Sequence, residues 1–295
     1  MSIVETRMSY LEPWVGKDDE PYVRGKVEET YPRTNFTNQE FTVRVSDARP
    51  TKDDFDLDTH GFAFHDSPIN DQVIEVIRSK EKDAVKNSYY PLVEDLVKKH
   101  TMASKVIIFD HTYRKKDPSL APTENPNGRE QPATLVSNSI LASWSGSVAN
   151  ITRYTLISQA QVRSGGSDVT QEKKLKRCLR AEYRSSINGP VEDWPLAVMD
   201  YRSIQPSEIH PTSIFKERFE MQGQTVSINH SEAQRWYYLH GQQTSEVTFI
   251  KIWDRKDDHD VAKLCPHCAF PDPQAPADAK PRESIEVRCL VFYED

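Results

Sequence analysis

Near its C-terminal end, the chain places a histidine, an arginine and a serine in an order suited to binding a carboxylate. His267 lies in the segment PHCAF, and Arg282 and Ser284 follow a Pro-rich connection in RESIEVRCLVFY. Alternate side chains of a β-strand share a face, so Arg282, Ser284, Glu286 and Arg288 should point the same way. A guanidinium beside a hydroxyl can hold a carboxylate through two hydrogen bonds. We therefore predict a carboxylate site at Arg282 and Ser284.

The spacing of apolar residues predicts the helices and strands that position these residues. Ile69 to Lys82 and Tyr90 to His100 have the periodicity of amphipathic helices, and Val106 to Tyr113 that of a buried strand. Strand-like runs follow at TVSIN, QRWYYL, VTFIKIW and SIEVRCLVFY, separated by turn-rich segments. Helices followed by many antiparallel strands predict a mainly β fold: a double-stranded β-helix, or jelly-roll and cupin-like core, with flanking α-helices.

We expect one domain over residues 1–295. Residues 1–68 are polar and Pro-rich and predict an N-terminal arm of short strands, and residues 69–114 hold the helices and the first core strand. Residues 115–132 are rich in Pro, Asn and Gly and predict a variable loop or lid. Residues 133–295 should then form the barrel core.

The composition and net charge of the chain argue against some classes of partner. The net charge is −7 and no basic run is interleaved with aromatic residues, so nucleic acid is not an expected partner. No segment approaches the roughly 20 apolar residues that span a bilayer, and no signal sequence is recognisable, so we expect no membrane association. Four cysteines do not form a disulfide framework, which suits a reducing compartment. We expect a soluble, cytoplasmic protein.

Several strings, in this order, match one fungal family: YPRTNF, GFAF, YYPLVEDLVKK, VIIFDHTYR, GPVEDWPLAVMD, QRWYY and PHCAF…PRESIEVR. The chain resembles, nearly end to end, the secondary-metabolite hydroxylases and desaturases named after asaB and the gibberellin desaturase. The resemblance implies a double-stranded β-helix oxygenase that uses Fe(II), 2-oxoglutarate and O₂. It further implies that His267 is in the position of an iron ligand, and that Arg282 and Ser284 bind the far carboxylate of 2-oxoglutarate.

The chain departs from this family at the motif that supplies the other two iron ligands. The family reads Val-His-x-Asp, whereas this chain reads Val136-Ser137-Asn138-Ser139. Serine hydroxyls bind Fe(II) far more weakly than an imidazole or a carboxylate. We therefore expect a vestigial metal position at His267 with Ser137 and Ser139 at the other ligand positions, a vestigial 2-oxoglutarate site at Arg282 and Ser284, and no catalytic residue.

From these expectations we predict that the chain is a non-catalytic subunit. We expect this chain to bind no cofactor and to support a paralogous, active Fe(II)/2-oxoglutarate oxygenase in a heterodimer, with Fe(II) and 2-oxoglutarate in the partner. In this respect it is similar to the inactive subunit of heterodimeric fungal meroterpenoid oxygenases of the talaromyolide type. The alternative is an active hydroxylase or desaturase with unusual ligands, for which Asp110 or His111 could join His267.

Two other interpretations concern the tetrapeptide Cys265-Pro266-His267-Cys268. It matches the active-site string of an oxidising thiol-disulfide exchange protein, but such a site needs a helix directly after it, and prolines follow here. A structural zinc site would need a second pair of ligands, which Cys178 and Cys289 are not spaced to supply. Trp236 could line a substrate pocket, although an aromatic residue on a barrel strand is more often core.

Overall fold

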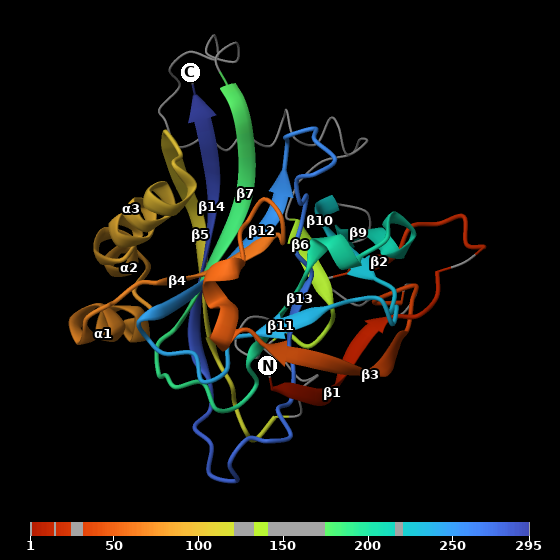
Figure 1. The fold of residues 1–295 in the computed structure, drawn as a ribbon, viewed down its shortest axis with the longest axis horizontal. Coiled ribbons are helices and arrows are strands. Elements are labelled where there is room, and N and C mark those ends of the chain that lie inside the picture. Colours follow the sequence, from red (N-terminus) through yellow and green to blue (C-terminus); the bar gives the residue numbers. More distant parts are fainter. Residues whose placement is uncertain are drawn as a thin grey trace.

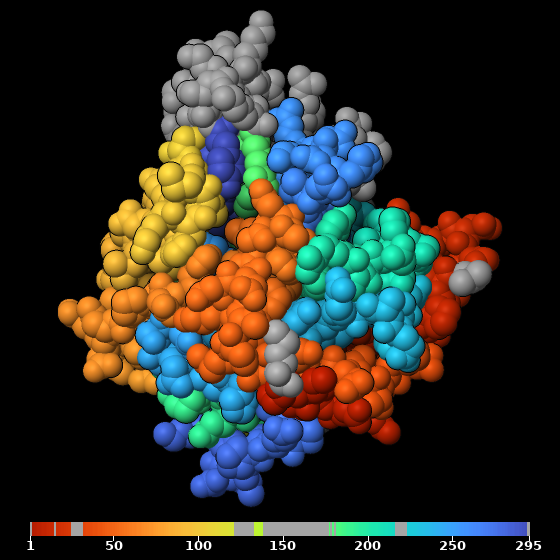
Figure 2. Space-filling view, in the orientation of Figure 1, coloured from red at the N-terminus to blue at the C-terminus, as the bar shows by residue number. Residues whose placement is uncertain are grey.

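The computed structural model describes residues 2–14, 16–24, 32–120, 133–140, 175–215 and 221–294. Two β-sheets face one another, and three helices cover the outer side of the smaller sheet (Figure 1). Figure 2 shows the Pro-rich connection between β13 and β14 as a lobe that projects at the bottom of the molecule. Among the described residues, no helix is long and apolar enough to cross a membrane.

The larger sheet has nine strands in the order β1-β3-β11-β8-β13-β6-β10-β9-β2. The strands are β1 (Ile3–Leu11), β2 (Tyr22–Arg24), β3 (Asn38–Asp47), β6 (Ser137–Ile140), β8 (Leu196–Met199), β9 (Ile209–Phe215), β10 (Met221–Ile228), β11 (Trp236–Tyr238) and β13 (His267–Ala269). Short 3₁₀ helices lie at Arg49–Asp54, Tyr201–Ser203 and Pro206–Glu208.

The smaller sheet has five strands in the order β4-β12-β7-β14-β5, all antiparallel to their neighbours. They are β4 (Phe62–Asp66), β5 (Lys105–Lys115), β7 (Leu175–Ser186), β12 (Glu246–Asp254) and β14 (Glu283–Glu294). The helices are α1 (Asp71–Ser79), α2 (Lys82–Ser88) and α3 (Tyr90–Thr101).

Alternation along β7 and β14 divides the smaller sheet into an apolar face and a charged face. Ile285, Val287 and Cys289 pack with the buried apolar side chains of α1, α2 and α3. The residues between them, Glu286 and Arg288, point the other way and are buried in ion pairs. The helices therefore bury the apolar face, and the charged face lies toward the interior.

Helix boundaries follow ordinary capping chemistry. The Asn70 side chain accepts a hydrogen bond from the backbone N–H of Val73 and begins α1, and Lys80 ends it in a left-handed conformation. The helix α3 begins at Tyr90 with a proline in its first turn, a position where the missing N–H costs no hydrogen bond.

The mainly β fold with flanking helices is confirmed, with two differences in detail. The arm expected as short strands contains β1 and β3, which are 9 and 10 residues long and form one edge of the larger sheet. The helix α2 and the strand β7 were not anticipated. Of the loop expected over 115–132, residues 121–132 lie outside the described ranges.

Candidate functional site

His267 begins β13 and lies between β8 and β6 in the larger sheet, where its direct cross-strand partners are Val198 and Ser137. The imidazole is 5% exposed. Directly opposite residues of an antiparallel pair place their Cβ atoms about 4.5–5.5 Å apart on one face. The register therefore brings Ser137 beside His267, as the family resemblance implies for two ligand positions. The side chain of Ser139 is outside the described part of the structure.

The hydrogen bonds of His267 determine which ring nitrogen carries its proton. Nδ1 lies 2.9 Å from the backbone carbonyl oxygen of Cys265, which can only accept, so Nδ1 must be the donor. Burial, followed by the positive charge of Arg184, lowers the pKa of His267 to about 4. The ring is therefore neutral at pH 7, and Nε2 presents a lone pair, which is the tautomer that a metal-binding histidine needs.

The lone pair of His267 points to a carboxylate and a guanidinium from β7. Nε2 lies 3.6 Å from Oε2 of Glu182 and 3.1 Å from Nη2 of Arg184. Glu182 is 1% exposed, so its charge is held within the protein by ion pairs with Arg184 and Arg288. A buried imidazole and a buried carboxylate thus meet where the two sheets face one another.

A network of ion pairs continues from this point across the charged face of the smaller sheet. Glu286 pairs with Arg184 at 2.7 Å, with Arg114 at 3.2 Å and with Arg288. Arg288 also pairs with Asp110 at 2.8 Å. Breaking such a buried pair from one side typically costs about 3–5 kcal/mol, because the remaining charge is left without compensation.

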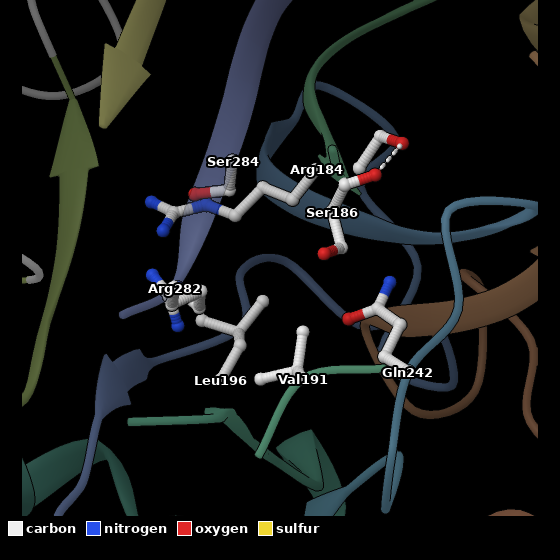
Figure 3. Close-up of a pocket in the computed structure, with 8 residues that line it drawn as sticks. Arg184, Ser186, Val191, Leu196, Gln242, Arg282 and Ser284 are labelled. Carbon is white, nitrogen blue, oxygen red and sulfur yellow. Dashed lines mark hydrogen bonds between the residues drawn. The ribbon is translucent and has the colours of Figure 1, made fainter. Parts of the chain in front are cut away.

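Arg282 and Ser284 line a small cavity next to this network (Figure 3). The cavity offers about 20 Å³ to a water-sized molecule, room for roughly one water. Figure 3 shows the side chains of Arg184 and Arg282 on the same side of it, and Gln242 on the other. The lining residues are Arg184, Ser185, Ser186, Val191, Leu196, Gln242, Arg282 and Ser284.

Two polar groups at this cavity have few partners within the protein. Arg282 is 5% exposed and donates to the backbone oxygen of Trp194, and within the described ranges no carboxylate forms an ion pair with it. Burial, reinforced by the positive charges of Arg184 and Arg114, lowers the pKa of Arg282 to about 9. Oγ of Ser186 is buried without a hydrogen-bond partner. Asp193, the carboxylate whose charge acts on Arg282, is itself paired with Lys116, so the buried guanidinium is only partly compensated and the cavity is suited to an anion.

The donors fit a metal ion in part. His267 and Glu182 combine an imidazole nitrogen with a carboxylate oxygen, a set that suits Fe(II). Among the described residues, no group of three His, Cys, Asp or Glu side chains converges on one point. The structure therefore brings one imidazole and one carboxylate to within 3.6 Å of each other, both in contact with Arg184, with the hydroxyl of Ser137 on the neighbouring strand.

The other residues considered from the sequence have different roles. His111 lies on β5, where its Nδ1 is 2.8 Å from the hydroxyl of Tyr90, and Asp110 pairs with Arg288. Cys265 and Cys268 are buried, and burial raises the pKa of the Cys268 thiol to about 12, so neither is a reactive thiol. Trp236 is part of the core, where its Nε1 donates to Tyr10.

Glu182, Arg184, Ser186 and Gln242 were not identified from the sequence. Three of them lie on β7, whose segment CLRAEYRSS alternates apolar and charged residues, the pattern of a half-buried strand. That alternation was itself a usable signal, because charges spaced by two residues share a face of a strand.

Comparison with known proteins identifies the relatives of this chain. A family model described as an oxidoreductase/YMDC permease-like domain matches residues 8–292. The Fe(II)/2-oxoglutarate-dependent dioxygenase nvfI of Aspergillus novofumigatus is 32% identical over 98% of this chain and 96% of its own length. The solved structure of the iron and alpha-ketoglutarate-dependent endoperoxidase NvfI superposes with a TM-score of 0.82, covering 100% of this chain and 99% of that one.

A shorter match is closer in sequence. Aspirochlorine biosynthesis protein N of Aspergillus oryzae is 59% identical over 109 residues, which are 37% of this chain and 45% of that protein. The chain therefore aligns with less than half the length of this relative.

These matches contradict the prediction that this chain binds no cofactor, because a protein dependent on iron and alpha-ketoglutarate matches it from end to end. The physical reason for the error lies at His267. Motif spacing counted only ligands close in sequence to Ser137, whereas the folded chain brings Glu182 to within 3.6 Å of the imidazole.

Proposed function

This chain belongs to the fungal family of Fe(II)/2-oxoglutarate-dependent dioxygenases of secondary-metabolite biosynthesis, and we propose that it is itself an oxygenase. In this proposal Arg282 and Ser284 hold a carboxylate of 2-oxoglutarate, and His267 and Glu182 hold Fe(II). The substrate would be a fungal natural product that undergoes hydroxylation, desaturation or a related oxidation.

The observation that carries the proposal is the buried, unpaired guanidinium of Arg282 in a cavity lined by hydroxyl and amide groups. A carboxylate there would restore charge balance and could accept hydrogen bonds from Arg282, Ser284, Ser186 and Gln242. The charges around the cavity are consistent with a carboxylate ligand. Arg282 has the positive charges of Arg184 and Arg114 and the negative charge of Asp193 near it, and Asp193 is itself paired with Lys116.

The metal position is supported by the tautomer of His267 and the nearness of Glu182. When bound, Fe(II) supplies the activation of O₂ that couples decarboxylation of 2-oxoglutarate to oxidation of the substrate. The protein's own part is to position both groups. The backbone oxygen of Cys265 fixes the imidazole ring, and Arg288 orients the carboxylate of Glu182 through a 3.2 Å hydrogen bond.

The test is metal binding and 2-oxoglutarate turnover by the purified chain alone. Under anaerobic conditions we would titrate Fe(II) in the presence of 2-oxoglutarate, then admit O₂ and measure succinate. Arg282→Gln should raise the KM for 2-oxoglutarate, and Glu182→Gln should weaken Fe(II) binding. Arg7→Gln, on an exposed edge strand, is the matched control. Absence of iron binding in the wild-type chain, or succinate formation unaffected by both substitutions, would refute the proposal.

Partnership with a paralogous oxygenase remains a second proposal, motivated by Ser137, which pairs with His267 where the family has a stronger ligand. A heterodimer would allow a partner to compensate for weak iron binding here. Co-expression with an intact paralogue, followed by size-exclusion chromatography, tests it: separate elution of the two chains and unchanged turnover on mixing would reject the partnership.

A further inference from the structure

Trp194, in the segment that connects β7 to β8, has a backbone conformation that is unusual for its residue type. Its φ is 50°, in the left-handed region that residues other than glycine rarely adopt. Pro195 follows it, and a residue before proline is normally extended. A bulky residue keeps such a strained conformation only where its surroundings fix it. The contacts of Trp194 and its neighbours therefore need to account for this strain.

The backbone oxygen of Trp194 accepts a hydrogen bond from Nη1 of Arg282 at 2.5 Å. The backbone oxygen of Arg282 in turn accepts from the backbone N–H of Lys116, the residue directly after β5, at 3.0 Å. Arg282 is thus held at its side chain by the segment before β8 and at its backbone by the end of β5.

Lys116 also contacts the segment before β8 through its side chain. Its ammonium group pairs with the carboxylate of Asp193, and the two side chains are only 21% and 16% exposed. Nζ of Lys116 lies 5.4 Å from the centroid of the Trp194 ring, within the range of a cation–π contact. Salt screens a partly buried ion pair much less than an exposed one. We call Lys116, Asp193 and Trp194 the clasp.

The clasp adjoins the carboxylate cavity. Val191 and Leu196, which lie on either side of Asp193 and Trp194 along the chain, both line it, and Figure 3 shows Leu196 next to Arg282. A guanidinium binds a carboxylate through two parallel hydrogen bonds only when the two planar groups are aligned. The orientation of the Arg282 guanidinium at the cavity therefore depends on the acceptor that holds Nη1.

We propose that the clasp of Lys116, Asp193 and Trp194 positions the guanidinium of Arg282 for a carboxylate ligand without touching that ligand. The inference rests on the proposed function only in taking Arg282 as the carboxylate-binding residue, and it requires no metal. A long side chain that is already oriented in the empty cavity loses less conformational entropy when the carboxylate binds. The three residues of the clasp are positioning residues.

The test measures binding of 2-oxoglutarate in the absence of metal, by titration with saturation-transfer difference NMR. Asp193→Asn breaks the ion pair and preserves the shape of the side chain. If the oriented fraction of Arg282 falls to about one-tenth, the dissociation constant should rise about tenfold. A role of Asp193 as a mere counter-charge to Arg282 predicts the opposite sign, because loss of its negative charge would tighten anion binding. Tighter or unchanged binding by Asp193→Asn would overturn the clasp.

Variants of Lys116 complete the test. Lys116→Gln should weaken binding as much as Asp193→Asn, and the double variant should bind as each single variant does, because both break the same pair. Lys116→Arg keeps the pair and should retain the wild-type affinity. Glu94→Gln, which breaks an ion pair with Lys98 on α3, is the control and should also bind as the wild type does. Additive losses of about a hundredfold in the double variant would contradict a shared clasp.

The strained backbone is tested by comparing Trp194→Gly with Trp194→Ala. Both variants remove the ring, but only glycine adopts the left-handed conformation without strain. Trp194→Gly should therefore have the higher melting temperature by circular dichroism, although glycine is ordinarily the less stabilising of the two residues. A higher melting temperature for Trp194→Ala would show that Trp194 does not need the left-handed conformation, and so would remove the basis of the clasp.

Failure of the clasp and failure of the proposed function give different results. Wild-type chain that binds no 2-oxoglutarate, or Arg282→Gln that binds it as the wild type does, would refute the carboxylate site and the clasp with it. Loss of binding in Arg282→Gln together with wild-type affinity in Asp193→Asn would refute the clasp alone. Circular dichroism spectra and melting temperatures establish that each variant is folded at the temperature of the titration.

Discussion

At the scale of single residues, the site is governed by charges that the protein buries and then compensates. His267 is neutral and offers Nε2, Glu182 is charged, and Arg184 lies between them. Arg282 differs from Arg184 and Arg288, because in the described structure a backbone oxygen accepts from it and no carboxylate forms an ion pair with it. Such an exception to charge pairing usually marks a functional site.

Arg282→Gln should weaken 2-oxoglutarate binding by about 10- to 100-fold, because a charge-assisted hydrogen bond contributes roughly 1.5–3 kcal/mol. The same substitution removes a buried cation that Asp193 compensates only in part, so the ligand-free protein should be at least as stable as the wild type. Binding is measured by calorimetry and the melting temperature by circular dichroism. Unchanged affinity for 2-oxoglutarate would place its carboxylate elsewhere.

At the scale of elements, the pairing of β13 with β6 decides which side chains can share a metal ion. Ser137 is the direct antiparallel partner of His267, and β6 continues into pairing with β10. A side chain introduced at residue 137 therefore projects next to the imidazole. The strand β7 brings Glu182 from the opposite sheet to the same point.

Ser137→His should strengthen Co(II) binding by more than the roughly 10- to 100-fold that outer hydrogen-bonding partners contribute at metal sites. The second imidazole adds a neutral nitrogen donor beside His267. Calorimetry and the Co(II) absorption spectrum would report the added nitrogen. Thr42→His, exposed on β3 of the same sheet, is the control and should leave the affinity as it was. An equal gain in both variants would indicate nonspecific binding.

The contact between α3 and β4 makes stability depend on pH. The rings of His65 and His100 stack with centroids 3.7 Å apart, and burial, followed by the charge of His100, lowers the pKa of His65 to about 4. A histidine in an unfolded chain has a pKa of about 6.5. The unfolded state therefore takes up the proton more readily, so stability should be full above pH 6.5 and should fall as the pH drops toward 4.

His65→Phe keeps a ring in the stack and removes this titration. Melting temperatures between pH 7 and pH 4 should decline less steeply for the variant than for the wild type. His259→Phe changes an exposed histidine and should retain the wild-type slope. Identical slopes for His65→Phe and the wild type would assign the acid sensitivity to other groups.

At the scale of the whole molecule, the site joins the two sheets. His267 belongs to the larger sheet, and Glu182, Arg184, Glu286 and Ser284 belong to the smaller one. Helices α1 to α3 support the smaller sheet from outside through its apolar face. Ligands that bridge the sheets should therefore stabilise both of them together.

Co(II) and 2-oxoglutarate together should slow hydrogen exchange in both β13 and β14. At a hundredfold excess over the dissociation constant, binding should stabilise the folded state by about 2.7 kcal/mol. Hydrogen exchange followed by mass spectrometry measures each strand separately, and Arg282→Gln should lose the protection from 2-oxoglutarate. Protection confined to β14 would show that the ligand does not bridge the sheets.

The sequence by itself determined the mainly β architecture and placed Arg282 and Ser284 on one strand. Periodicity of 3.6 residues identified α1 and α3, because burial of one face of a helix imposes this period on the chain, and strand-like runs identified β12 and β14. The alternation of side chains along a strand placed Arg282, Ser284, Glu286 and Arg288 on one face. His267 was identified because it precedes Arg282 and Ser284 along the chain, the order that the family resemblance implies for an iron ligand and a carboxylate site.

Only the tertiary structure decided what surrounds His267. Glu182 and Arg184 lie more than 80 positions earlier in the chain, and their distance from the imidazole depends on how the two sheets pack. Sequence spacing reports on neighbours within a strand or helix, whereas contacts between sheets depend on register and packing. For that reason Ser137 and Ser139 suggested a lost metal site, and the folded chain offers a carboxylate from another strand.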